Sequence, residues 1–279
     1  MEPCKIRLGR IHYINVDPIY YVFDQGHGPG WVEIVEAAPS VLNQMLLEGY
    51  LDVSPVSSIA YARHFAHWSL LPELSISSHG RVMSVILASR VPLKELQGKL
   101  ILLSRESETS VALLRLCLER EGICAHLVRE KLDSKEGLAK TAGAALVIGD
   151  TALQWGRNGL FPHTLDLGQY WSAWTARPFV YALWAVSDEA LRKNPSGIAA
   201  LVKMLKNSLK QGMDRMDFIA QHAGHKLGLP HGLMRRYFQG LSYDLGYKEQ
   251  TGMLLFFERL YEKGLLEKAV PLKFVACSE

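Results

Sequence analysis

The run Phe179-Val180-Tyr181-Ala182-Leu183-Trp184-Ala185-Val186 is the strongest apolar segment of the chain. It is too short for a membrane-spanning helix, which needs about 20 residues, and its length is typical of a buried β-strand. A second apolar strand is predicted over residues 82–88. These two strands flank residues 92–177, which hold a strand–helix–strand set of their own. We therefore expect a discontinuous arrangement, in which the chain leaves one lobe, builds a second lobe and returns.

This arrangement predicts a two-lobe α/β fold. Residues 1–88 and 187–279 are assigned to the first lobe, and residues 89–186 are assigned to the second. Strands alternate with helices as far as Ser187, after which the pattern is helical. The alternation favours mixed, mostly parallel sheets with helices on both faces. A ligand cleft is expected between the lobes, at the carboxyl ends of the strands.

Composition places the chain among ordinary globular proteins. Its 279 residues are 48% hydrophobic and 21% charged, with a net charge of +3. The charge balance excludes a polybasic nucleic-acid-binding protein, and the hydrophobic content excludes a disordered chain. The first residues lack the apolar core of a signal peptide, and the four cysteines form no C-x-x-C pair. We therefore expect a cytoplasmic protein with reduced thiols and no membrane segment.

Small hydroxyl or acidic residues follow three predicted strands, at the points where helices begin. They are Ser57 with Ser58, Thr109 with Ser110, and Asp150. The N-terminus of a helix presents unpaired N–H groups and a partial positive charge, so such a junction can bind a carboxylate or phosphate without an arginine. The same residue types are also ordinary N-caps, with no ligand. Two junctions that face each other across a cleft would bind a dianion.

Asn15 follows the first predicted strand, residues 6–14, on the side expected for the ligand. Its amide can donate and accept hydrogen bonds, although it cannot act as a strong base. The alternative is a turn-forming role before Asp17-Pro18. Asn15 is therefore a candidate contact for a polar ligand.

Metal and nucleotide motifs do not stand out in the sequence. His64 and His67, like His222 and His225, have helical i,i+3 spacing without a third ligand in an established motif, so surface or packing roles are favoured. The glycine-rich residues 26–30 are not followed by the Lys-Ser or Lys-Thr of a phosphate-binding loop. The helical tail shows no helix-turn-helix joined to a basic face. We expect no metal, no cofactor and no nucleic-acid partner.

Several motifs occur in the order found in one known family. They include Gly9-Arg10-Ile11-His12-Tyr13-Ile14-Asn15-Val16-Asp17-Pro18, Gly80-Arg81-Val82-Met83-Ser84-Val85, Ser107-Glu108-Thr109-Ser110 and Asp166-Leu167-Gly168. Together they resemble the chorismate dehydratases of the futalosine route to menaquinone, over nearly the whole chain. Pro55 departs from the family pattern, where an ordinary strand residue such as leucine is expected.

The resemblance implies a type 2 periplasmic-binding-protein-like fold and a lyase that removes water from chorismate, giving 3-[(1-carboxyvinyl)oxy]benzoate. Chorismate has two carboxylates, which matches two hydroxyl-rich junctions. Under this interpretation the catalytic residues are Asn15 and Ser84, and the substrate-binding residues are Ser57, Ser58, Thr109, Ser110 and Asp150.

Two alternatives stay open. One is the related 1,4-dihydroxy-6-naphthoate synthase of the same pathway, whose opening looks more like Ser-Pro-Cys-Pro-Asn-Asp. The other is a cytoplasmic solute-binding module that uses the same fold without chemistry.

Overall fold

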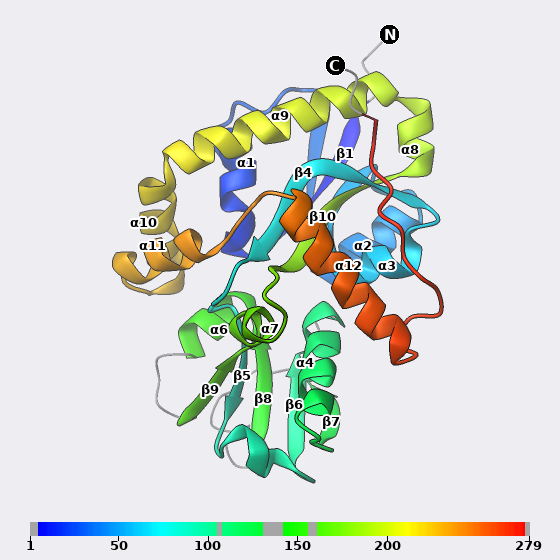
Figure 1. Cartoon of the computed structure of the whole chain (residues 1–279). Coiled ribbons are helices and arrows are strands. Elements are labelled where there is room, and N and C mark those ends of the chain that lie inside the picture. Colours follow the sequence, from blue (N-terminus) through cyan, green and yellow to red (C-terminus); the bar gives the residue numbers. More distant parts are fainter. Residues whose placement is uncertain (1–4, 105–107, 131–141, 156–160, 277–279) are drawn as a thin grey trace.

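Two β-sheets, each packed against helices, form two lobes that lie one above the other in Figure 1. The computed structural model describes residues 5–104, 108–130, 142–155 and 161–276. The α/β class predicted from the alternation of strands and helices is confirmed.

The first sheet has five strands in the order β2-β1-β3-β10-β4. Their bounds are Ile6–Ile11 for β1, Val32–Ala37 for β2, Val53–Ser57 for β3, Trp68–Ser78 for β4 and Phe179–Ser187 for β10. β1 pairs in parallel with β2 and β3, whereas β10 runs antiparallel between β3 and β4. Because β10 alone reverses direction, the sheet is mostly parallel, as predicted.

The second sheet repeats this plan with five strands in the order β7-β6-β8-β5-β9. Their bounds are Val85–Ser89 for β5, Leu100–Ser104 for β6, His126–Glu130 for β7, Ala144–Ile148 for β8 and His163–Asp166 for β9. β6 is parallel to β7 and β8, and β5 runs antiparallel between β8 and β9. In each sheet, the reversed strand is therefore the first one formed after the chain crosses between lobes.

Helices cover both sheets. In Figure 1, α1, α10 and α11 lie to one side of the first sheet, and α2, α3 and α12 lie to the other. The helices of the first lobe are η1 (Ile14–Val16), α1 (Asp17–Asp24), α2 (Pro39–Leu47), α3 (Ser58–His64), α8 (Asp188–Lys193), α9 (Pro195–Asp214), α10 (Met216–Leu227), α11 (His231–Gly240) and α12 (Tyr247–Glu262). Within the described residues, those of the second lobe are η2 (Leu93–Leu96), α4 (Glu108–Arg120), α6 (Gly149–Trp155) and α7 (Leu167–Thr175).

The sheets divide the chain at different points from the expected boundaries at residues 88/89 and 186/187. β5 belongs to the second sheet and β10 to the first. The chain therefore crosses between lobes at residues 79–84, before β5, and at residues 176–178, before β10. A continuous apolar strand can be buried equally well in either sheet, so its composition does not say on which side of a crossing it lies.

The apolar run that predicted a buried strand lies in the middle of the first sheet. Leu183, Trp184, Ala185 and Val186 of β10 are fully buried, at 0% exposure. No helix within the described residues is both long enough and apolar enough to cross a membrane. Cys117 and Cys124 are free thiols, and the other two cysteines lie outside the described residues.

Candidate active site between the lobes

A cavity lies between the lobes, at the carboxyl ends of parallel strands from both sheets. Its empty volume, including the part open to solvent, is about 670 Å³. The polar lining residues are Tyr13, Asn15, Ser57, Ser84, Thr109, Ser110 and Tyr181. The apolar lining residues are Ile11, Pro39, Pro55, Val56, Ile76, Val82, Val85, Ile148, Gly149 and Ala182. A mostly apolar cavity with a few polar groups is typical of a small-molecule site.

Asn15 reaches the cavity from η1, the short 3-10 helix between β1 and α1. Its Oδ1 atom is buried and has no hydrogen-bond partner among the described residues. A buried acceptor left unpaired costs about 1–3 kcal/mol, so natural proteins rarely retain one without a reason. Because Asn15 also lines the cavity, it is a candidate contact for a ligand there.

Ser57 and Thr109 bring two of the predicted junctions together. Ser57 caps α3 in the first lobe and accepts a hydrogen bond from the N–H of Ala60 at 3.3 Å. Thr109, in the first turn of α4 in the second lobe, accepts one from the N–H of Ile59 at 3.0 Å. Each hydroxyl keeps its own hydrogen to donate. A carboxylate in the cavity can therefore receive one hydroxyl donor from each lobe.

Ser110 lines the cavity beside Thr109 and is buried. Ser107, which belongs to the same motif, lies outside the described residues.

Ser58 and Asp150 are not among the residues that line the cavity. The Ser58 hydroxyl is fully buried and donates to the carbonyl oxygen of Val180 at 2.6 Å. Asp150 spans the two lobes, since its Oδ1 accepts a hydrogen bond from the N–H of Ile14 at 3.3 Å. Burial raises the pKa of Asp150, and the Ile14 N–H opposes that rise. Asp150 therefore stabilises the turn next to Asn15 through the Ile14 N–H, and Ser58 bonds to the backbone of β10.

Ser84 comes directly before β5 and lines the cavity. Its carbonyl oxygen accepts a hydrogen bond from the N–H of Gly149 at 2.7 Å. On the other wall, the Tyr181 hydroxyl lies 3.1 Å from the Ser78 hydroxyl. Burial raises the pKa of Tyr181 well above its ordinary value, so this phenol stays neutral and can donate a hydrogen bond.

Direct contacts join the lobes around the cavity. A Cβ atom on Gly149 would lie 2.6 Å from the Tyr13 ring, so this ring packs against the second lobe too closely for any side chain at position 149. Nearby, Arg63 of α3 pairs with Glu108 of α4, which also pairs with Arg129 at 3.0 Å. The Tyr13–Gly149 and Arg63–Glu108 contacts therefore cross from the first lobe to the second.

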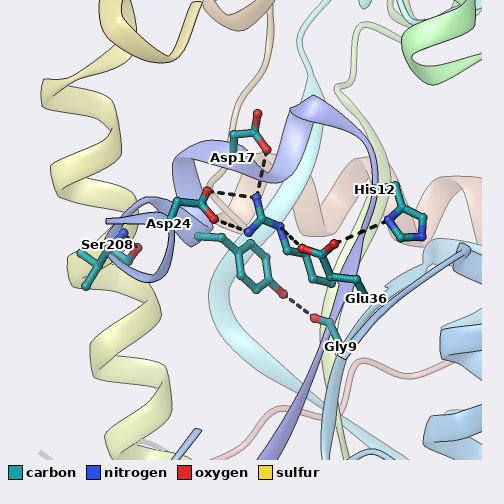
Figure 2. A network of polar contacts seen from close by, with 9 residues as sticks. Gly9, His12, Asp17, Asp24, Glu36 and Ser208 are labelled. Atoms are coloured by element: carbon teal, nitrogen blue, oxygen red, sulfur yellow. Dashed lines mark hydrogen bonds and ion pairs between the residues drawn. The ribbon is translucent and has the colours of Figure 1, made fainter. Parts of the chain in front are cut away.

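The described part of the lining carries no formally charged side chain. Charges gather instead around Arg10, whose partners Asp17, Asp24 and Glu36 are labelled in Figure 2. Its guanidinium pairs with Asp24, with Asp17 at 3.3 Å and with Glu36 at 3.6 Å. Burial raises the pKa of Asp17 to about 6, although Arg10 and Lys226 oppose the rise. Within the described ranges, no three potential metal-ligating side chains come together.

Several lining residues were not among the sequence-based candidates. Tyr13 and Tyr181 supply polar groups, and Ile76 belongs to β4, a strand that the sequence analysis did not predict. Tyr181 lies within the apolar run of β10, where the sequence alone does not distinguish a cavity-facing phenol from a core residue. Tyr13, two residues before Asn15, could have been found by including the whole strand-to-helix turn.

Comparisons with known proteins agree with this geometry. The family model described as "Menaquinone biosynthesis" matches residues 6–262. A chorismate dehydratase from Thermus thermophilus is 32% identical over 271 residues, covering 91% of this chain and 94% of that protein. Both findings agree with the resemblance to chorismate dehydratases that the sequence motifs show.

Solved structures establish the fold. Protein AF1704 from Archaeoglobus fulgidus superposes with a TM-score of 0.76 at 19% identity, covering 95% of this chain and all of that one (100%). The CA3427 gene product of Candida albicans, which exhibits the generic periplasmic binding protein fold, has a TM-score of 0.75 at 12% identity and covers 99% and 98% of the two chains. The chain has a periplasmic-binding-protein-like fold and belongs to the menaquinone biosynthesis family.

Proposed function

We propose that this chain is a chorismate dehydratase, a hydro-lyase that converts chorismate to 3-[(1-carboxyvinyl)oxy]benzoate and water. The related protein of that name, with matched coverage of both chains, supports the reaction. The observation that carries the site is Asn15, which lines the inter-lobe cavity and whose buried Oδ1 has no partner among the described residues.

The reaction needs positioning more than strong acid or base catalysis. The hydroxyl leaves C4 of chorismate with the bonding electron pair, and the proton leaves C3. The electrons of the C3–H bond complete the aromatic ring, while hydroxide and proton together make one water. Aromatisation supplies much of the driving force. An enzyme that holds the substrate in the reactive conformation and excludes water therefore meets the main requirement.

The cavity suits a substrate that supplies its own base. Its described lining contains amide, hydroxyl and phenol groups and no carboxylate or histidine. We assign proton acceptance to the enolpyruvyl carboxylate of chorismate, with Asn15 orienting that group or the leaving hydroxyl. Ser84 provides a second polar contact near the reacting carbons. Neither side chain changes its own protonation state in this scheme.

Donors from both lobes then bind the substrate carboxylates. Ser57 and Thr109 each have a hydroxyl hydrogen to donate, and Ser110 lies beside Thr109. Neutral donors in a partly desolvated cavity bind a carboxylate through short, charge-assisted hydrogen bonds. Because the two donors come from different lobes, substrate binding favours the closed arrangement.

Incubation of the purified chain with chorismate tests the proposal. We expect the ultraviolet absorbance of the diene to change into that of a benzene ring, and mass spectrometry to detect a product lighter by one water. Binding of chorismate without turnover would indicate a solute-binding module. Turnover of the cleaved futalosine product instead of chorismate would indicate the sister synthase, and either result overturns the assignment.

A further inference from the structure

The residue directly before Ser84 has a strained backbone conformation. Ser84 is the last residue of the crossing segment, residues 79–84, which carries the chain from β4 to β5. Met83, directly before it, has a φ of 64°, in the left-handed region that disfavours residues other than glycine. Met83 keeps this conformation only if neighbouring contacts stabilise it. Those contacts also fix the direction in which Ser84 enters the cavity.

Asp166, the last residue of β9, supplies these contacts. Its Oδ2 accepts a hydrogen bond from the N–H of Met83 at 2.7 Å, and both carboxylate oxygens lie 3.1 Å from the N–H nitrogen of Val82. Its Oδ1 also accepts from the N–H of Gln169 at 3.0 Å. The Asp166 residue is only 7% exposed. A buried carboxylate surrounded by backbone donors is a strong and directional anchor.

Helix capping explains only part of this arrangement. Gln169 is the partner that an N-cap of α7 requires, whereas Met83 and Val82 belong to a segment more than 80 positions earlier in the chain. The start of α7 also packs closely on the crossing segment. A Cβ atom on Gly168 would lie 2.7 Å from the carbonyl oxygen of Gly80 and 2.8 Å from the Ser78 hydroxyl. Asp166 therefore joins α7 to the backbone that carries Ser84.

The other side of Ser84 is anchored independently. Its carbonyl oxygen accepts from the N–H of Gly149, at the start of α6. Ser84 thus lies between two backbone anchors, and its side chain also hydrogen-bonds to Tyr237. Of the two backbone anchors, the Asp166 carboxylate is the one that holds the left-handed turn.

We propose that Asp166 is a positioning residue for Ser84: it holds the Val82–Met83 backbone and thereby places Ser84 in the cavity lining, where it can contact the substrate. This inference rests on the proposed function, in which Ser84 contacts chorismate. Asp166 does not line the cavity in the part of the chain described, so its effect on catalysis passes through Ser84.

A double-mutant cycle tests this coupling. Asp166→Asn keeps the side-chain size but replaces one acceptor oxygen with an NH₂ group that faces backbone donors. We expect kcat to fall roughly tenfold, with KM changed by less than about threefold, because misplacing a contact group mainly affects the transition state. When Ser84→Ala is already present, Asp166→Asn should lower kcat by less than about twofold, because the two changes act on one contact.

Asn194→Ala provides the matched control. Asn194 also caps a helix, α9, by accepting from the N–H of Gly197 at 3.0 Å, but it lies away from the cavity lining. This variant should lower the Tm and leave kcat unchanged. The proposal is overturned if Asp166→Asn retains the parent kcat, or if its loss is the same with and without Ser84.

Met83→Gly serves as the second variant if Asp166→Asn does not fold. Glycine adopts a φ of 64° without strain, so the change loosens the turn and preserves the fold. We expect kcat to fall roughly threefold with Ser84 present and not to change in the Ser84→Ala background. Equal losses in both backgrounds, or none, would contradict the proposal. Failure of the parent chain to convert chorismate would instead reject the proposed function, so the two failures are distinct.

Discussion

The inter-lobe cavity and the cluster around Arg10 both use side chains from residues 10–17, but they differ in charge. The Arg10 cluster is rich in charge, but its guanidinium is already paired with carboxylates from α1 and β2 (Figure 2). The cavity has no charge in its described lining, yet Asn15, one of its lining residues, has an unpaired Oδ1. We therefore expect the ligand in the cavity, where an acceptor is left unpaired, and not at the Arg10 cluster, where the charges already have partners.

Asn15→Ala should produce the largest effect and tests the cavity side of this comparison. We expect kcat to fall roughly 10²-fold or more, because the lost amide stabilises charge that develops in the transition state. KM should change much less. Steady-state kinetics with chorismate, together with circular dichroism to verify folding, measures both. Turnover near that of the parent in a folded variant would reject a catalytic role for Asn15.

Arg10→Met tests the charged cluster. This change leaves Asp17 and Asp24 without their cationic partner, so the free energy of unfolding should fall by roughly 2–3 kcal/mol. The kcat and KM for chorismate should remain within about twofold of the parent at a temperature where both are folded. Chemical denaturation and kinetics check the two halves of this prediction. A large loss of kcat with unchanged stability would show that the cluster takes part in the reaction.

Asp17→Asn should change how stability depends on pH. Burial raises the pKa of Asp17 to about 6, above its value in the unfolded chain. The folded state therefore binds this proton more tightly, and the Asp17 contribution to stability falls as pH rises from about 4 to about 6. Asparagine cannot ionise. The stability of the variant relative to the parent should rise by roughly 1–2 kcal/mol over that interval.

Denaturation of both proteins at pH 4, 5, 6 and 7 measures the difference. Loss of the Arg10–Asp17 contact changes stability at every pH where Asp17 is ionised. The pKa of Asp17 is therefore tested by how the stability difference between variant and parent varies with pH, and not by its value at one pH. A difference that does not vary with pH would contradict the raised pKa.

Thr109→Ala removes one donor from the second lobe. If Thr109 mainly holds a carboxylate, KM should rise roughly 3–10-fold with little change in kcat, the pattern expected for a contact made equally in the ground and transition states. A collapse of kcat at unchanged KM would instead assign Thr109 a catalytic role.

Ser58→Ala should have the smallest effect. Its hydroxyl donates to the Val180 carbonyl, so the change should lower the free energy of unfolding by about 1 kcal/mol. KM should change less than in Thr109→Ala. A larger rise in KM for Ser58→Ala would restore the sequence-based assignment of Ser58 to the substrate.

Much of the fold could be predicted because its strands are short, apolar and followed by turn or capping residues. Residues 144–148 and the run that begins at Phe179 are strands as expected. β4 was not predicted because Pro72 and Glu73 interrupt it, and Glu73 has a φ of 59° at an irregular point in the pairing with β10. A proline inside an apolar run weakens the evidence for a strand.

The candidate site could be predicted in part for a similar reason. Hydroxyl residues at helix starts can be recognised in the sequence, and Ser57 and Thr109 do meet at the cavity. Ser57 and Ser58 are adjacent, but their side chains point in different directions. Ser57 lines the cavity, whereas the Ser58 hydroxyl donates to Val180 of β10. That direction depends on where the strand ends and the helix begins, to within one residue. The role of Asp166 depends on a contact across more than 80 positions, which no local pattern encodes.

A crystal structure of the Asn15→Ala variant soaked with chorismate shows where the substrate binds, because slow turnover leaves the substrate intact. We expect chorismate in the inter-lobe cavity, with a carboxylate held by the Ser57 and Thr109 hydroxyls and the C4 hydroxyl beside position 15. Chorismate bound at the Arg10 cluster, or an empty inter-lobe cavity at saturating ligand, would contradict this expectation.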